Sequence, residues 1–261
     1  MSQPIENKIR HVLTESGLEE MEEEILSTLI PYLQIQPGAE EEDLPIGTSK
    51  FGGYPDLPMD ERYPEVPGRM LSFLAQYNLE ELAATGTVSS LPKRGMLYFF
   101  ISLDDIHRPT PPSPDAWVVF YREAMGADLR PALLPDEMSR ELLIPERSIT
   151  FSLEKQLPDV EASTDMNELY FHLMDQLYDL EEREDGDHQA FGQPLEISGN
   201  VIQECSQHSG IPTDDWVLLL QVDTSLLEHE GTGLGMLYFC IPQEDLFTHR
   251  FNRTWFVAQH H

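Results

Sequence analysis

Basic residues and cysteines are scarce in this sequence. Its 261 residues include 16 Lys and Arg against 47 Asp and Glu, which gives a formal net charge of −31. Affinity for nucleic acid depends on cations that neutralise phosphates, so this charge excludes nucleic acid as the expected partner, and it disfavours an anionic membrane surface for the same reason. The two cysteines, Cys205 and Cys240, are too few for a disulfide framework. We therefore expect a protein of the reducing cytoplasm.

Long apolar runs and motifs of known chemistry are also missing. No run approaches the ~18 apolar residues of a membrane-spanning helix, and the N-terminus lacks the apolar segment of a secretory signal. No Gly-x-Ser-x-Gly motif occurs, and the glycine-rich residues 231–235 precede a predicted strand, whereas a dinucleotide-binding loop follows one. Cys205 and His208 have the spacing of two zinc ligands, but no second pair completes a site. We expect no cofactor, no metal and no catalytic residue.

The sequence does contain an internal repeat. Residues 95–101 read Gly-Met-Leu-Tyr-Phe-Phe-Ile, and residues 235–241 repeat six of these seven residues at an offset of 140. Three further markers recur in the same order, and chance is an unsatisfactory explanation of four ordered matches. These markers are Phe51-Gly52 with Phe191-Gly192, the strand-like stretches around Gln76 and Gln221, and the stretches that begin at Trp117 and Trp255.

The repeat predicts an α+β fold with mixed or antiparallel sheets, built from two strand–helix–strand modules at residues 46–122 and 187–261. In each module a Gly- and Pro-rich turn precedes a buried strand, a short capped helix and an aromatic strand. Apolar residues at helical spacing predict two N-terminal helices within residues 1–45, separated near Gly17. Residues 123–186 form a helical, acidic insert that also contains an alternating strand from Ser148 to Leu153. We expect one domain over residues 1–261.

Several of these motifs resemble the YwqG-like family of bacterial proteins. The resemblance rests on Lys50-Phe51-Gly52-Gly53, on Phe73-Leu74-Ala75-Gln76, on Leu219 to Asp223 and on both Gly-Met-Leu-Tyr-Phe stretches, and it covers residues 45–259. It implies a single α+β domain with internal pseudo-symmetry and carries no settled biochemical function. Members are sometimes associated with toxin–immunity gene neighbourhoods, which implies a protein-binding role. The loop before residue 235 lacks the Trp and Asp that relatives often carry there.

Polar residues at matching places in the two modules are candidates for a ligand cleft. Gln76 and Asn78 lie two residues apart on one predicted strand, and Gln221 and Asp223 repeat the pattern, so each pair points to one side of its strand. If the modules pack about a pseudo-dyad, these four side chains and Lys50 could line a shared cleft. Alternatively, Asn78 and Asp223 cap the helices that follow them, and each glutamine bonds to nearby backbone.

An acidic surface is the second candidate. Residues 123–190 hold 18 acidic against 5 basic residues, and charge of this kind steers a basic partner or simply keeps the surface solvated. The candidate partner-binding residues are Asp179, Glu181, Glu182, Glu184 and Asp185.

The sequence thus supports three classes of function. The first is a non-catalytic module that binds a basic protein, for example as an immunity protein against a basic toxin. The second is a small-ligand-binding or enzymatic domain that uses the cleft between the modules. The third is a housekeeping interaction role with no specific acidic partner.

Overall fold

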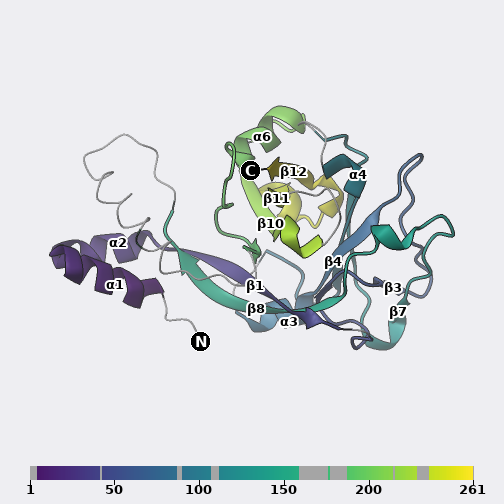
Figure 1. The fold of residues 1–261 in the computed structure, drawn as a ribbon, viewed down its shortest axis with the longest axis horizontal. Coiled ribbons are helices and arrows are strands. Elements are labelled where there is room, and N and C mark those ends of the chain that lie inside the picture. The colour runs from purple at the N-terminus through teal and green to yellow at the C-terminus, as the bar shows by residue number, and fades with distance from the viewer. Residues whose placement is uncertain are drawn as a thin grey trace.

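The computed structural model describes residues 5–41, 43–86, 90–106, 112–158, 176, 187–213, 215–227 and 235–260. The N-terminal helices are those expected from the sequence. Helix α1 (Ile5–Ser16) ends before Gly17, and the short η1 (Glu19–Met21) leads into α2 (Glu22–Thr28). Their apolar faces form a small core of their own around Ile9, Val12, Leu13, Ile25 and Leu157. This helical pair lies at one end of the molecule, beyond strands β1 and β8 (Figure 1).

One large sheet dominates the described part of the chain and confirms the expected α+β class. Its ten strands lie in the order β12-β11-β10-β9-β1-β8-β2-β4-β5-β6, and every pairing is antiparallel. The strands are β1 (Ile30–Glu40), β2 (Lys50–Phe51), β4 (Ser72–Asn78), β5 (Met96–Ile101), β6 (Trp117–Arg122), β8 (Arg147–Gln156), β9 (Gln189–Ala190), β10 (Trp216–Asp223), β11 (Gly235–Pro242) and β12 (Trp255–His260).

The remaining elements are short. A two-stranded sheet pairs β3 (Asp56–Pro58) with β7 (Leu129–Pro131). The other helices are α3 (Leu79–Ala84), α4 (Leu103–Ile106), η2 (Gly126–Asp128), η3 (Arg140–Leu142), α6 (Val201–His208), η4 (Thr224–Leu227), α7 (Gln243–Phe247) and η5 (Phe251–Arg253). None of the helices formed by described residues has both the length and the apolar character needed to cross a bilayer.

The duplication includes a strand that the sequence did not reveal. Residues 1–45 were expected to be helical, yet β1 lies in the centre of the sheet, and the predicted strand at 148–153 is its counterpart β8. Strand β1 precedes the first module in the chain but pairs with β9 of the second, whereas β8 precedes the second module and pairs with β2 of the first. The leading strands are therefore exchanged between the modules.

Irregularities of the strands are repeated too. The pairing of β4 with β5 has a bulge at Leu74, and the pairing of β10 with β11 has one at Leu219, the residue 145 positions later. Each Gly-Met-Leu-Tyr-Phe stretch begins with glycine for the same steric reason in both modules. A Cβ on Gly95 would lie 2.6 Å from the carbonyl oxygen of Arg122, and one on Gly235 would lie 2.3 Å from that of Gln259. Strand-to-strand contact thus excludes a side chain at both positions.

The match of Phe51-Gly52 with Phe191-Gly192, which the sequence repeat suggested, is wrong by one residue. Phe51 does not correspond to Phe191, because Lys50 pairs with Gln76 in the first module where Gln189 pairs with Gln221 in the second. The true offset here is 139, which matches Gly52 with Phe191. Both have positive φ, of 59° and 60° respectively, so Phe191 occupies a backbone conformation that glycine adopts with less strain.

The two halves of the sheet pack against each other through aromatic side chains. The rings of Phe99 and Phe239 lie 5.4 Å apart, those of Trp117 and Trp255 lie 5.0 Å apart, and the Tyr77 hydroxyl donates to the carbonyl of Leu219 at 3.3 Å. Every residue of β5 and β11 is buried, so both faces of these two strands are covered.

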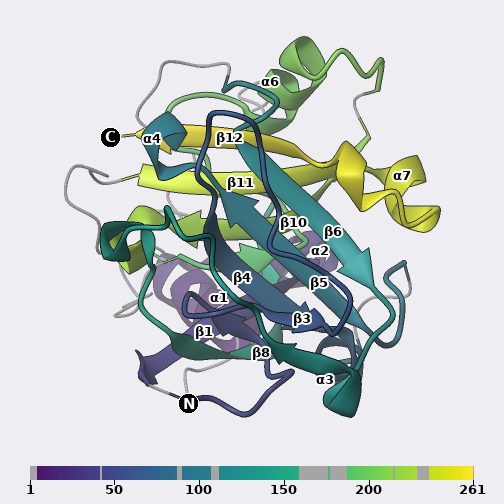
Figure 2. The same cartoon turned by 90° about the vertical axis from the view of Figure 1, so that its right-hand side faces the viewer.

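That second layer differs between the modules. Over the second module it includes helix α6, whose Val201 and Cys205 belong to the main core. Over the first module it is formed by β3, β7 and the residues around Tyr63, which pack on Tyr98 and Phe100. Figure 2 shows β3 in front of β4 and β5. The modules therefore share their strands and differ in what covers them.

Candidate functional site

The two glutamines expected in a cleft are buried within their own modules. The Gln76 side chain accepts from the backbone N–H of Asp56 at 2.8 Å and donates to the carbonyl of Thr48 at 2.8 Å. Gln221 makes the equivalent bonds, accepting from Leu195 N–H at 2.8 Å and donating to the Asp187 carbonyl at 3.0 Å. Each glutamine thus holds the loops that flank its module's short strand, as the second interpretation of the sequence proposed.

Asn78 and Asp223 cap the helices that follow them, which was the alternative to a role in a ligand cleft. Asn78 Oδ1 accepts from Glu80 N–H at 3.0 Å at the start of α3, and Asp223 Oδ1 accepts from Ser225 N–H at 2.8 Å at the start of η4. Caps of this type satisfy helix N–H groups that have no partner within the helix. The structure brings Gln76 and Asn78 together with Lys50 in one module, and Gln221 with Asp223 in the other, with the aromatic core between the modules.

Lys50 differs from its counterpart in the second module. Its buried ammonium lies 2.7 Å from Glu146 Oε1 and 3.5 Å from Asp56 Oδ2. Asp56 Oδ2 also accepts from Gly47 N–H at 2.9 Å. The equivalent of Lys50 is the neutral Gln189, so this charged cluster is not part of the shared fold. The five acidic partner-binding candidates, Asp179 to Asp185, lie outside the described residues.

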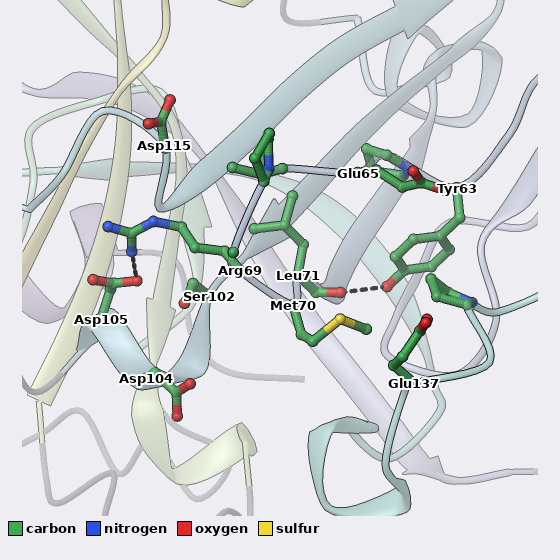
Figure 3. Close-up of a pocket in the computed structure, with 15 residues that line it drawn as sticks. Tyr63, Glu65, Arg69, Met70, Leu71, Ser102, Asp104, Asp105, Asp115 and Glu137 are labelled. Atoms are coloured by element: carbon green, nitrogen blue, oxygen red, sulfur yellow. Dashed lines mark hydrogen bonds and ion pairs between the residues drawn. The ribbon is translucent and has the colours of Figure 1, made fainter.

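A pocket lies on the cover of the first module. Its volume is about 810 Å³, within the range of ligand-binding pockets in proteins. Four segments form it: the irregular chain from Tyr63 to Leu71, the start of α4, the loop around Asp115 and the loop around Glu137 (Figure 3). The Tyr63 hydroxyl closes the first segment by donating to the Leu71 carbonyl at 2.7 Å. Burial raises the pKa of Tyr63, so this donor stays protonated.

One ion pair in the pocket belongs to the shared fold. Arg69 pairs with the buried Asp105 on α4, and the equivalent Asp245 on α7, 140 residues later, pairs with Arg250. The arginines come from unrelated parts of the two modules, but both neutralise an aspartate at the same place. The buried carboxylate therefore explains why Arg69 is present, and this arginine serves the fold.

The other charged residues of the pocket are all acidic. Four exposed carboxylates line it, and among the residues that the structure describes no cation pairs with any of them. They are Glu65, Asp104, Asp115 and Glu137. Carboxylates around a concave surface raise the local concentration of cations. The described residues contain no group of three or more His, Cys, Asp or Glu placed to hold a metal ion.

Little in the sequence indicates this pocket. Glu65, Asp115 and Glu137 come from irregular segments with no motif, and folding alone brings them together. One signal was available: Asp105 and Asp245 stand at the repeat offset of 140. That match would have indicated the buried aspartate, but not the exposed ones around it.

A comparison with known protein families finds one family that the chain matches. The profile of a domain of unknown function, DUF1963, matches residues 49–259. The chain belongs to this family. The DUF1963 match includes both modules and the whole pocket, and it begins after α1, α2 and β1. No curated protein matches the chain.

Proposed function

We propose that this DUF1963 protein is a non-catalytic binding module that recognises a basic protein through the pocket of the first module. The observation that carries the proposal is the set of four exposed carboxylates that line the pocket. The net charge of −31 supports it, because a field of this sign attracts a cationic partner from a distance. The narrower resemblance to YwqG-like proteins supports an immunity-like role, in which the basic partner is a toxin.

The small-ligand alternative gains no comparable support. It placed the ligand between the modules, where the rings of Phe99 and Phe239 are in contact. The described pocket lies instead on the outer layer of one module, and its acidic lining suits a basic side chain on a protein surface. The proposal assigns no catalytic residue.

The test compares two variants with the same change in net charge. One carries Glu65→Gln, Asp115→Asn and Glu137→Gln; the control carries Glu20→Gln, Glu23→Gln and Asp215→Asn, at exposed residues outside the pocket lining. The probe is a short peptide of alternating arginine and glycine, and its affinity is measured by calorimetry. We expect the pocket variant to bind on the order of tenfold more weakly, because exposed ion pairs contribute about 0.2–1 kcal/mol each, and the control to bind nearly as the wild type does. Equal binding by both variants would contradict the proposal.

A further inference from the structure

Two large apolar side chains are exposed in the segments that flank the small sheet. In the sheet Asp56 lies opposite Pro131, and the N–H of Ala132 donates to the Pro55 carbonyl at 2.8 Å. Tyr54 precedes Pro55 and Leu133 follows Ala132, so both residues lie just beyond the same end of the small sheet. Their exposed fractions are 47% and 80%, so most of the leucine side chain is in contact with solvent.

This apolar pair adjoins the acidic pocket. Leu133 is two residues from Pro135, which lines the pocket, so the Cα atoms of the two residues are at most about 8 Å apart. Single exposed apolar residues are common on proteins and need no explanation. Two exposed apolar residues beside a pocket lined by exposed carboxylates have the arrangement of a binding surface, in which an apolar anchor has a charged surround.

The comparison of the modules shows that the shared fold does not require this pair. The second module has the same bulged strands, glutamine bonds and buried aspartate, but α6 contributes to its cover in place of β3 and β7. Tyr54 and Leu133 belong to segments that flank these two strands. Their exposure is therefore a property of the first module's own cover, as the pocket is.

We propose that Tyr54, Leu133 and the pocket form one docking surface for a basic, amphipathic segment of a partner protein. An arginine or lysine of the segment enters the pocket, and an apolar side chain of the segment covers Leu133. Charge complementarity identifies the occupant, since four carboxylates without a described cation partner accept basic groups and repel acidic ones. The inference rests on the proposed function and adds the apolar half of the ligand.

The experiment uses the full-length protein and two peptides. One peptide alternates arginine and glycine, and the other has leucine in place of half of its glycines. The variant is Leu133→Ser, which changes an exposed side chain and should leave the thermal midpoint unchanged. Its control is Phe247→Ser, at a residue 58% exposed in the second module. We expect the wild type and the control to bind the leucine-containing peptide about tenfold more tightly than the other peptide, as burial of one leucine side chain provides.

Each outcome has one meaning. Loss of the leucine preference in Leu133→Ser, with unchanged affinity for the arginine–glycine peptide, supports the docking surface. Equal affinity of the wild type for both peptides, or a preference that Leu133→Ser retains, overturns it while the proposed function stands. If neither peptide binds to the wild type, the proposed function itself fails, and the docking surface fails with it.

Discussion

Substitution of Phe99 tests the packing between the two modules most directly. Its ring is fully buried, and its centroid lies 5.1 Å from that of Tyr77 and 5.4 Å from that of Phe239, so truncation leaves a cavity between the modules. We expect Phe99→Ala to lower the free energy of unfolding by about 3–5 kcal/mol, the usual range for a buried phenylalanine. Urea denaturation measures it, with Phe247→Ala as the exposed control. A change near zero in Phe99→Ala would show that the modules do not depend on this contact.

Residues that the duplication repeats could be predicted from sequence, and those specific to one module could not. Capping by Asn78 and Asp223 was one of two interpretations of the sequence, and it could be foreseen because capping depends on the local sequence. The glycines at 95 and 235 were markers of the repeat, and the contact that excludes a side chain there explains them. Glu65 and Glu137 gave no signal, because their proximity depends on the path of two irregular segments around the first module.

At the scale of elements, the exchange of β1 and β8 is what joins the modules. Sequence patterns show a strand more readily than its partners, and β1 carries Pro31 and Pro37, which are atypical of a central strand. Its residues alternate too weakly in polarity to predict a strand inside the sheet. Strand β8 alternates clearly and was predicted, but as part of an insert, because nothing local indicates that it pairs with both β1 and β2.

Lys50 links β2 to the residue before β8, so its substitution tests whether contact between these two elements stabilises the fold. Its ammonium on β2 binds Glu146, which immediately precedes β8, and replacement by methionine leaves two carboxylates without their cation. We expect Lys50→Met to cost about 3–5 kcal/mol of stability, as the loss of one partner of a buried pair does. The control is Lys155→Met, which removes a surface pair with Glu6 and should cost no more than about 1 kcal/mol. Denaturant midpoints that fall equally in the two variants would contradict a special role for Lys50.

At the scale of the whole molecule, the proposed docking surface lies apart from the core between the modules. The core between the modules is apolar and nearly symmetric, whereas the pocket, Tyr54 and Leu133 belong to the outer layer of the first module. Residues 46–122 hold 9 acidic and 7 basic residues, so the first module as a whole is almost neutral. Several of its carboxylates are gathered at the pocket. The large excess of acid lies in the other segments and acts at long range.

That long-range field leads to a kinetic prediction. Amide substitution of the five acidic candidates of the insert should leave the fold nearly unchanged, because a run of like charges usually serves solubility. These are Asp179, Glu181, Glu182, Glu184 and Asp185. The substitutions should slow association with a basic partner recovered from the source cell, since complementary charge acts on the on-rate more than on the affinity.

Salt should slow association of the wild type in the same way, because the Debye length is only ~8 Å at physiological ionic strength. Stopped-flow rates at two salt concentrations measure both effects. A partner that is not basic, or an on-rate that ignores both the salt and the substitutions, would leave the acidic segment as a solvated surface only.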